Sequence, residues 1–567
     1  MRREAIPRSL LLVAGIVLFT WIGFSIFPGH TYLQSDTQIY LPILERLDTP
    51  GYLSRDLVAF RPHVSYTIYD EVTISLHQAF DWPFERILIA QQLVFRALGF
   101  LGIYLLVLAT GLSRLESFLV AAVFHLGAAL LGPAVLLVEY EPVPRAFASG
   151  LVFLALGLFV QRKPLVAGLA GSLAVLYQPP TAVPFWGVLV LGFIFDRNLR
   201  RDAKPLFLPL LVAGLLLANL AQLQPGVVEN QKFFGELSPQ LSAIQHFRTK
   251  YVWVSLWAAH DLWSYLSIWI CSLWATARLW PRLTLQWRWL AVVMPAGGLL
   301  SVPFSYLLLE VSNLSVVPAL QPARALVFTI AFGSILCGTA AAYAIREGRR
   351  LEAFGWLLVV FAIPIRVRVL DLFHLTTSSD VQQLAGWITL AALAALSLTA
   401  VRRNALQFGV SVVAIAILSA FLIPLSGVTN FSRFQKAPVE DLAAWAVVNT
   451  WGSSLFLFPD AGHGLDPGYF RARSRRALWV DWKSGGQVNY FESFAEEWWS
   501  RWQNTMEGEY STKRLQGMLD LPVDYFVLQR RNRLADIKPV YQNERYVVYD
   551  SRDLRNSSTS LRKGTED

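Results

Sequence analysis

Asp36 is the first side chain along the sequence that could do chemistry. It lies in the polar segment 34–38, shortly after the first apolar run ends. A carboxylate there could act as a general base toward a hydroxyl group, or bind a divalent cation such as Mg²⁺ or Mn²⁺. An aspartate in front of an amphipathic helix is also a common N-cap, and the spacing by itself favours that interpretation.

A second group of ionisable residues lies in the short segment 139–145, between two apolar runs. Ionisable groups at that depth usually face a polar cavity and not lipid. Glu141 is therefore a second catalytic candidate, and Glu139 and Arg145 are candidates for substrate binding. Arg145 would suit a phosphate or pyrophosphate group. The simpler alternative is that Glu141 and Arg145 pair with each other across one helical turn.

Polar residues also interrupt the apolar pattern at Gln178, and again at Gln321 and Arg324. Prolines follow both glutamines, and broken backbone at membrane depth normally lines an enclosed cavity. We therefore expect Gln178 and Gln321 to bind substrate and Arg324 to be a second phosphate ligand. Arg324 could equally extend toward the lipid headgroups.

Three further candidates lie farther from these segments. Asp56 is an acidic residue of the first long loop, and a salt bridge to Arg55 or Arg61 explains it as well. Asp481 and Lys483 follow a predicted strand, where α/β sheets commonly bind ligands. The alternative for Asp481 is an ion pair with one of several nearby arginines on a solvated face.

These candidates belong to a chain of 567 residues, of which 54% are hydrophobic and 16% charged, with a mean hydropathy of +0.43. A soluble domain carries about a quarter charged residues, so the composition indicates a membrane protein. The apolar runs predict a mostly α-helical polytopic protein with about thirteen transmembrane helices. They lie at about 9–27, 87–110, 117–138, 147–160, 164–177, 181–195, 205–222, 262–280, 289–309, 323–345, 351–365, 381–400 and 405–426.

Lys and Arg are concentrated in every second loop between these runs. The basic loops contain Arg114; Arg162 and Lys163; Arg197, Arg200, Arg201 and Lys204; Arg278, Arg282 and Arg288; Arg346, Arg349 and Arg350; and Arg402 and Arg403. The positive-inside rule places these loops and the N-terminus in the cytoplasm. We therefore expect an inner-membrane protein whose tail lies on the periplasmic side.

The chain divides into three parts by composition. Residues 1–426 form the transmembrane domain, with long outside loops at about 28–86 and 223–260. Residues 427–550 combine short strand-like segments with helical stretches, which predicts a small extracytoplasmic α/β domain. Residues 551–567 are polar and predict a disordered tail.

Several function classes have no support in the sequence. There is no Walker loop, dinucleotide-binding glycine pattern, HExxH or CxxC motif. Basic and aromatic residues are not arranged for nucleic-acid binding, so we expect no such partner. Cys271 and Cys337 lie in apolar runs and are interpreted as packing residues.

Taken together, this arrangement resembles the GT-C superfamily of polytopic glycosyltransferases. Asp36 matches the carboxylate that follows the first helix in that family, and Glu139 and Glu141 match the acidic residues of its short second outside loop. The segments 35–42, 321–324 and 475–483 look like a bacterial branch of the superfamily.

The resemblance implies a reaction and its partners. A sugar would pass from a polyprenyl-phosphate donor in the membrane to a glycan, lipid or protein acceptor on the outer face, with inversion at the anomeric carbon. Asp36 would deprotonate the acceptor, while Arg145 and Arg324 would stabilise the leaving phosphate. Ser35 precedes Asp36 where some subfamilies have an acidic pair, so a divalent cation at Asp36 stays open.

Two other functions fit the same sequence. The first is a transporter or flippase of lipid-linked sugars, although the sequence shows no internal repeat. The second is a non-catalytic GT-C-like assembly factor for surface polysaccharide.

Overall fold

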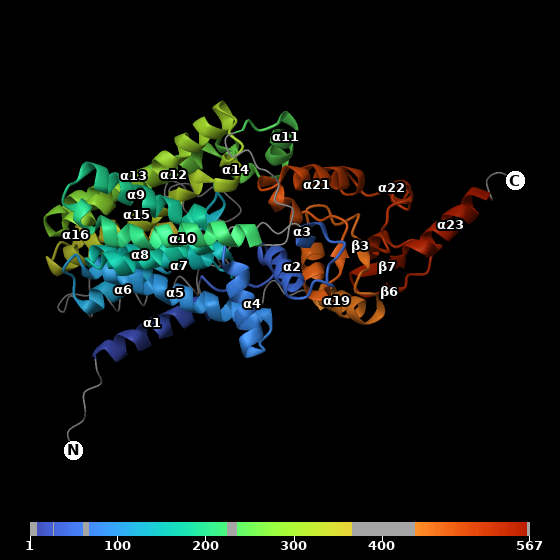
Figure 1. The fold of residues 1–567 in the computed structure, drawn as a ribbon, viewed down its shortest axis with the longest axis horizontal. Coiled ribbons are helices and arrows are strands. Elements are labelled where there is room, and N and C mark those ends of the chain that lie inside the picture. The colour runs from blue at the N-terminus through green and yellow to red at the C-terminus, as the bar shows by residue number, and fades with distance from the viewer. Residues whose placement is uncertain (1–7, 26–27, 61–66, 224–234, 366–436, 564–567) are drawn as a thin grey trace, which may run out of the picture.

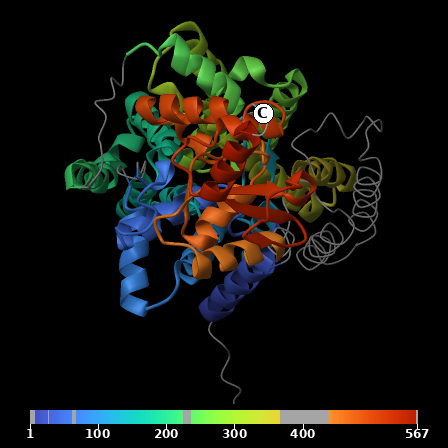
Figure 2. The ribbon, with the colours of Figure 1, turned by 90° about the vertical axis from the view of Figure 1, so that its right-hand side faces the viewer.

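The computed structural model describes residues 8–25, 28–60, 67–223, 235–365 and 437–563. Long helices form a bundle at one end of the molecule, and the C-terminal residues form a second body at the other end (Figure 1). Short helices from the two long loops, α2 (Thr37–Asp48), α3 (Leu57–Phe60) and α11 (Pro239–Arg248), lie beside the second body. Figure 2 shows this second body in front of the bundle.

The bundle is made of helices whose bounds follow most of the predicted apolar runs. They are α1 (Arg8–Ser25), α5 (Phe84–Leu108), α6 (Arg114–Phe124), α7 (Pro144–Val160), α8 (Pro164–Tyr177), α9 (Pro179–Phe195), α10 (Ala203–Leu223), α12 (Ala259–Leu279), α13 (Leu285–Tyr306), α15 (Leu326–Arg346) and α16 (Arg350–Ile365). Helix α4 (Tyr69–Phe80) precedes α5 in the first long loop.

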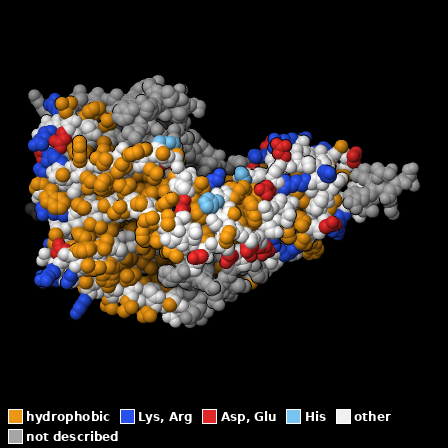
Figure 3. Space-filling view, turned by 90° about the horizontal axis from the view of Figure 1, so that it is seen from above, with side chains coloured by type: hydrophobic (Ala, Val, Ile, Leu, Met, Phe, Trp, Pro, Cys, Tyr) orange, Lys and Arg blue, Asp and Glu red, His pale blue; other side chains and the backbone are white. Residues whose placement is uncertain are grey.

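Exposed apolar side chains cover the surface of the bundle (Figure 3). They include Leu11, Leu165, Phe195, Leu211 and Trp274. A soluble protein rarely exposes a continuous apolar patch of this extent, so the belt is the lipid-facing surface. Three helical stretches, Phe84–Leu108, Leu285–Val311 and Val317–Arg346, are long and apolar enough to cross a membrane. The predicted polytopic membrane fold is confirmed.

Lys and Arg gather at the end of the bundle that is remote from the C-terminal body (Figure 3). Ion pairs connect loops of the predicted cytoplasmic set, from Arg346 to Glu116 at 2.6 Å and from Arg278 to Glu352 at 2.7 Å. The predicted spans at 381–400 and 405–426 lie outside the described residues. The count of about thirteen helices therefore stays a prediction.

Helices α5 and α7 pack closely because glycines lie at their contact. A Cβ atom at Gly102 would lie 2.3 Å from the backbone of Phe153, and one at Gly150 would lie 2.1 Å from the carbonyl oxygen of Phe95. Small residues let membrane helices approach to backbone distance. This contact holds α7 in place, and the first turn of α7 carries Arg145.

The predicted span at 117–138 is wrong in its second half. Helix α6 ends at Phe124, and strands β1 (Ala129–Leu130) and β2 (Val135–Leu136) form an antiparallel hairpin. Gly127 has a φ of 74°, which a right-handed helix cannot contain. An apolar run does not by itself distinguish a helix from a buried hairpin.

The C-terminal body is an α/β domain, as predicted. Its elements are α19 (Ala437–Asn449), β3 (Leu455–Leu457), α20 (Asp466–Ser474), β4 (Ala477–Leu478), η10 (Ser484–Asn489), α21 (Glu492–Thr505), α22 (Thr512–Gly517), β5 (Tyr525–Gln529), β6 (Tyr541–Gln542) and β7 (Tyr546–Asp550). The sheet order is β4-β3-β5-β7-β6. Strand β3 runs parallel to β4 and β5, while β7 is antiparallel to both β5 and β6.

The predicted disordered tail is instead a helix over most of its length, α23 (Ser551–Lys563). Leu554 is buried, and Arg555 donates a hydrogen bond to the carbonyl oxygen of Leu519 at 2.7 Å. These contacts stabilise the start of a helix whose composition alone favours disorder.

Candidate active site

Asp36 occupies the N-cap position of α2, but its side chain does not cap the helix. The carboxylate of Glu141 accepts the N–H groups of Ser35 and Asp36 at 2.6 Å each, and that of Thr37 at 3.4 Å. The first N–H groups of a helix need such an acceptor. Because Glu141 provides it, the carboxylate of Asp36 is left for other partners.

Those partners are two cations from distant parts of the sequence. Arg145 Nη1 lies 2.5 Å from Asp36 Oδ2. Lys483 Nζ donates to Asp36 Oδ1, and also to the hydroxyl of Ser35 at 2.6 Å. Burial by itself would raise the pKa of Asp36, but the charges of Lys483 and Arg145 outweigh it and hold that pKa well below its usual range. The two cations therefore favour the ionised form of Asp36, and 24% of its side chain is exposed.

Glu141 lies beneath Asp36, with 1% of its surface exposed. Burial and the neighbouring charge of Asp36 raise its pKa to about 7, against the opposing effect of Lys483. It does not line the cavity described below. Among the described residues, no ion pair joins Glu141 to Arg145, so the pairing considered from the sequence is not formed. Glu141 positions the loop that carries Asp36.

Arg145 instead pairs with Glu139. Its Nε lies 2.6 Å from Glu139 Oε1 and its Nη2 lies 3.3 Å from Oε2. The main chain of Glu139 is fixed in turn, because Arg96 and Gln92 of α5 donate to its carbonyl oxygen at 2.5 and 3.1 Å. The guanidinium of Arg145 is thus held between two carboxylates.

Above Asp36 lies an open cavity of about 400 Å³ between the bundle and the α/β domain. It is lined by Ser35, Asp36, Ile39, Tyr40, Ala129, Leu130, Leu131, Ala134, Val135, Leu136, Tyr140, Arg145, Gln178, Arg248, Tyr251, Gln321, Arg324, Lys483, Gly486, Gln487 and Tyr490. The hairpin β1–β2 contributes apolar residues to the lining, and Arg145, Arg248, Arg324 and Lys483 contribute cations. The cavity therefore offers an apolar and a charged surface to one ligand.

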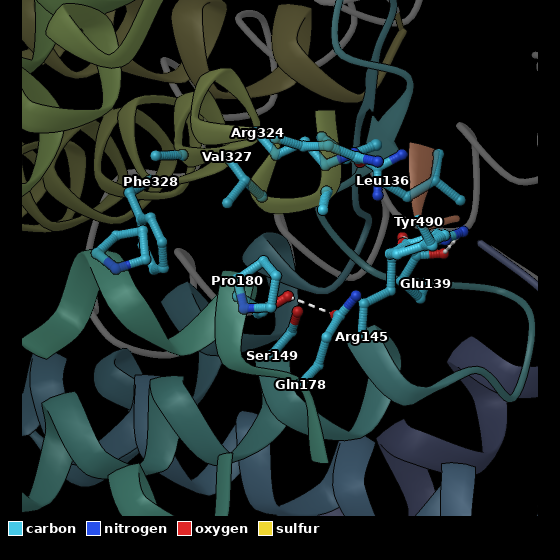
Figure 4. A pocket seen from close by; sticks show the side chains of 16 residues that line it. Leu136, Glu139, Arg145, Ser149, Gln178, Pro180, Arg324, Val327, Phe328 and Tyr490 are labelled. Carbon is cyan, nitrogen blue, oxygen red and sulfur yellow. Dashed lines mark hydrogen bonds and ion pairs between the residues drawn. The ribbon is translucent and has the colours of Figure 1, made fainter. Parts of the chain in front are cut away.

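A smaller recess, lined by many of the same residues, extends into the bundle (Figure 4). Glu139, Arg145 and Arg324 line it together with apolar residues such as Val327 and Phe328. In Figure 4 these side chains come from separate elements around one space. The recess connects the charged groups with the apolar interior of the bundle.

Arg324 is placed in the cavity by two short elements, α14 (Val317–Leu320) and η7 (Pro322–Ala325). Gln321 between them has left-handed backbone, with φ 49°. The guanidinium of Arg324 lies 5.1 Å from the ring of Tyr251, and its Nε is buried without a hydrogen-bond partner. No carboxylate in the described part of the chain pairs with it, so its charge is available to an anion.

Arg248 is a cavity residue that the sequence did not single out. Its Nε donates to the carbonyl oxygen of Trp482 at 2.8 Å, and its guanidinium lies 4.3 Å from the centre of the Trp482 ring. It too has no carboxylate partner within the described ranges. The segment 246–251, with His, Arg and Lys among aromatic residues, was the only signal for it.

Asp56 and Asp481 lie outside the cavity. Both carboxylates face Arg471, at 3.7 and 2.8 Å, and all three side chains are almost fully buried. Arg55, one of the expected partners of Asp56, pairs with Asp524 at 2.5 Å. The other expected partner, Arg61, lies outside the described residues.

Arg471 also donates to the carbonyl oxygen of Gln38 in the first turn of α2 at 3.0 Å. The α/β domain therefore holds the start of α2 through Arg471 and Lys483, and it holds a later turn through Arg475, which pairs with Glu45 at 2.8 Å. Asp481 is two residues before Lys483, so the buried ion pair fixes the backbone that carries the lysine. Asp481 pairs with an arginine as the sequence alternative proposed, but in a buried place and not on a solvated face.

No family model and no curated protein matches the sequence. Among solved structures, ArnT from Cupriavidus metallidurans bound to undecaprenyl phosphate matches with a TM-score of 0.50 and 13% identity, over 96% of this chain and 98% of that chain. The apo form of ArnT gives a TM-score of 0.49 and 11% identity, over 96% and 97%. Arabinofuranosyltransferase AftD from Mycobacteria gives 0.42 and 14%, over 97% of this chain and 40% of that chain. The chain has the fold of ArnT over nearly its whole length, in agreement with the fold class expected from the sequence.

Replacing Glu141 with alanine is expected to destabilise the protein by about 1–3 kcal/mol, because the N–H groups at the start of α2 lose their acceptor. Glu141→Gln should cost less, since the amide oxygen can still accept. Thermal unfolding of the purified protein in detergent measures both. An unchanged midpoint for Glu141→Ala would show that α2 does not depend on this cap.

Replacing Arg471 with methionine leaves two buried carboxylates without a cation, although both keep backbone N–H donors, and breaking a buried ion pair in this way costs about 3–5 kcal/mol. The matched control is Arg349→Met, because Arg349 is 60% exposed, and Glu347 and Glu352, with which it pairs at 3.3 and 3.4 Å, keep Arg278 as a partner. An exposed pair contributes about 0–1 kcal/mol. We expect a protease to cut between the α/β domain and the bundle faster in Arg471→Met than in the wild type, with no such change in the control variant. Equal cleavage rates in the two variants would contradict the structural role of Arg471.

Proposed function

We propose that the chain is a membrane glycosyltransferase that moves a sugar from a polyprenyl-phosphate donor to a hydroxyl group of an envelope glycan, lipid or protein. The observation that carries the proposal is the cavity at the bundle–domain junction. It places the carboxylate of Asp36 in one space with Arg248 and Arg324, which have no carboxylate partner in the described residues. ArnT, which has the same fold, binds undecaprenyl phosphate.

Arg248 and Arg324 would bind the phosphate of the donor, since guanidinium groups match phosphate oxygens in charge and geometry. The apolar hairpin and the recess would receive the first part of the lipid. The acceptor oxygen then attacks the anomeric carbon, and the bond from that carbon to the phosphate oxygen breaks. The bonding electron pair stays on the polyprenyl phosphate, whose charge the two arginines offset.

Asp36 would take the proton of the attacking hydroxyl. It is the one carboxylate that the described lining of the main cavity contains; Glu139 faces the recess and is paired with Arg145. A retaining mechanism needs a second carboxylate as nucleophile. We therefore propose a single displacement with inversion at the anomeric carbon.

The side of the reaction follows from the charges of the bundle. Its basic loops lie at the end remote from the α/β domain (Figure 3). By the positive-inside rule these loops are cytoplasmic. The cavity and the α/β domain would then lie on the periplasmic side of the inner membrane.

The carboxylates near the cavity do not fit a divalent cation. Asp36 is held by Arg145 and Lys483, Glu139 is held by Arg145, and Glu141 accepts three backbone N–H groups. No cluster of three or more His, Cys, Asp or Glu residues suited to a metal occurs in the described ranges. No step of the proposed reaction uses a metal ion.

Replacing Asp36 with asparagine is expected to lower kcat by about 10²–10⁴-fold, because the general base is lost. Asp48→Asn, at the other end of α2, is the matched control and should keep normal turnover. Transfer of labelled sugar from a polyprenyl-phosphate donor to an extracted envelope acceptor measures this. Full activity of Asp36→Asn would contradict the assignment, and donor uptake into vesicles without transfer would favour a transporter.

Turnover should be insensitive to chelation. We expect the rate in excess EDTA to match the rate with added Mg²⁺ or Mn²⁺, because arginine and lysine side chains occupy the carboxylates that a metal would need. The measurement is initial rate after dialysis against chelator. A loss of activity that returns with one of these ions would show that the carboxylates rearrange around a metal.

A further inference from the structure

The proposed reaction needs Asp36 to accept a proton, yet its carboxylate is bound by two cations. Each oxygen has one of them, Arg145 at Oδ2 and Lys483 at Oδ1. A carboxylate stabilised in this way is a poor base, because protonation must compete with two positive charges. One of the two contacts has to break before the acceptor can be deprotonated.

We propose that Lys483 is a positioning residue that leaves Asp36 for the phosphate of the bound donor, so that Asp36 becomes a competent base only after the donor has bound. The inference rests on the proposed function and adds an order of events to it. It also gives the α/β domain a direct part in the reaction, since that domain supplies the lysine.

Lys483 is the cation that can move. Arg145 is fixed in the first turn of α7 and makes two further hydrogen bonds to Glu139, at 2.6 and 3.3 Å. The ammonium of Lys483 contacts only Asp36 and the hydroxyl of Ser35 among the described residues. A lysine carries its charge on a flexible four-carbon stem with three rotatable donors.

The cavity offers Lys483 a second partner when the donor is bound. Lys483, Arg248 and Arg324 line the same space. Arg248 Nη2 also lies 3.4 Å from the carbonyl oxygen of Lys483, so a phosphate held by Arg248 would be close to this residue. Phosphate oxygens bind ammonium and guanidinium groups together. Departure of Lys483 leaves Asp36 with Arg145 as its one cationic partner among the described residues.

The backbone of Lys483 need not move for this exchange. Asp481 accepts hydrogen bonds from Arg471 at 2.8 Å and from the N–H of Ser484 at 2.9 Å, which fixes the chain on both sides of the lysine. Only the side chain has to turn from Asp36 into the cavity. The barrier is therefore that of a rotamer change and the exchange of one ion pair for another.

A double-mutant cycle on ligand affinity tests the exchange. Undecaprenyl phosphate is titrated into the full-length protein in nanodiscs, using the wild type, Asp36→Asn, Lys483→Met and the double variant. Asp36→Asn releases Lys483 and should bind the phosphate about tenfold more tightly, the size expected of one charge-assisted hydrogen bond. Lys483→Met should bind about tenfold more weakly, and in that background Asp36→Asn should give no gain.

Two further variants serve as controls. Lys250→Met removes an exposed lysine of the neighbouring loop and should match the wild type. Lys483→Arg keeps the positive charge, so Asp36→Asn should still raise the affinity for the phosphate in that background. This variant replaces Lys483→Met in the test if Lys483→Met folds poorly.

An equal gain from Asp36→Asn with and without Lys483 would overturn the inference, because the effect would then be the lost charge of Asp36 alone. The inference is also overturned if Asp36→Asn gives no gain in phosphate affinity in either background. Phosphate binding by the wild type would then still support the proposed function. Absence of binding in every variant, the wild type included, would overturn the proposed function and this inference with it.

Discussion

A carboxylate that is largely removed from water needs positive charge close to it. In this molecule, the bundle and the α/β domain pack so that each places a cation beside Asp36. The two cations that meet it come from residues 109 and 447 positions away in the sequence. One belongs to the first turn of a bundle helix and the other to the α/β domain. Bundle and domain therefore each supply a cation to one carboxylate, and that carboxylate lines the cavity between them.

The supporting contacts follow from the same need. Glycines in α5 and α7 allow the helix contact that brings Arg145 to the edge of the bundle. Glu141 accepts the N–H groups at the start of α2. Arg471 donates to the carbonyl oxygen of Gln38 in α2 and pairs with Asp481, two residues before Lys483. Arg145, Glu141 and Arg471 are each held by hydrogen bonds to named partners. Arg248 and Arg324 differ from them, because no carboxylate among the described residues pairs with either one. Their two unpaired positive charges make the cavity suitable for a phosphate.

Local patterns were enough to predict the general architecture. Apolar runs identified most helices of the bundle, and short apolar segments identified the strands of the α/β domain. Asp36, Arg145, Gln178, Gln321, Arg324 and Lys483 were all selected from their immediate neighbours in sequence, and they line one cavity. Gln178, Gln321 and Arg324 lie there because polar residues at the ends of apolar runs normally face an internal polar space, while their role in catalysis or binding stays a prediction.

The parts that could not be predicted depend on contacts between distant segments. Nothing near Glu141 in sequence shows that it caps α2, and nothing near Asp56 or Asp481 shows that both bind Arg471. The hairpin at 129–136 lies within one apolar run, and Gly132-Pro133 at its turn is the local signal against a helix there. The final helix α23 is held by contacts with residues 519–521 that its own polar sequence does not reveal.

A structure of the protein with a polyprenyl phosphate bound in nanodiscs tests the central claim most directly. The account predicts that the phosphate contacts Arg248 and Arg324, with the ammonium of Lys483 turned from Asp36 toward it. A phosphate bound elsewhere, with Asp36 and Lys483 still paired, would contradict the account.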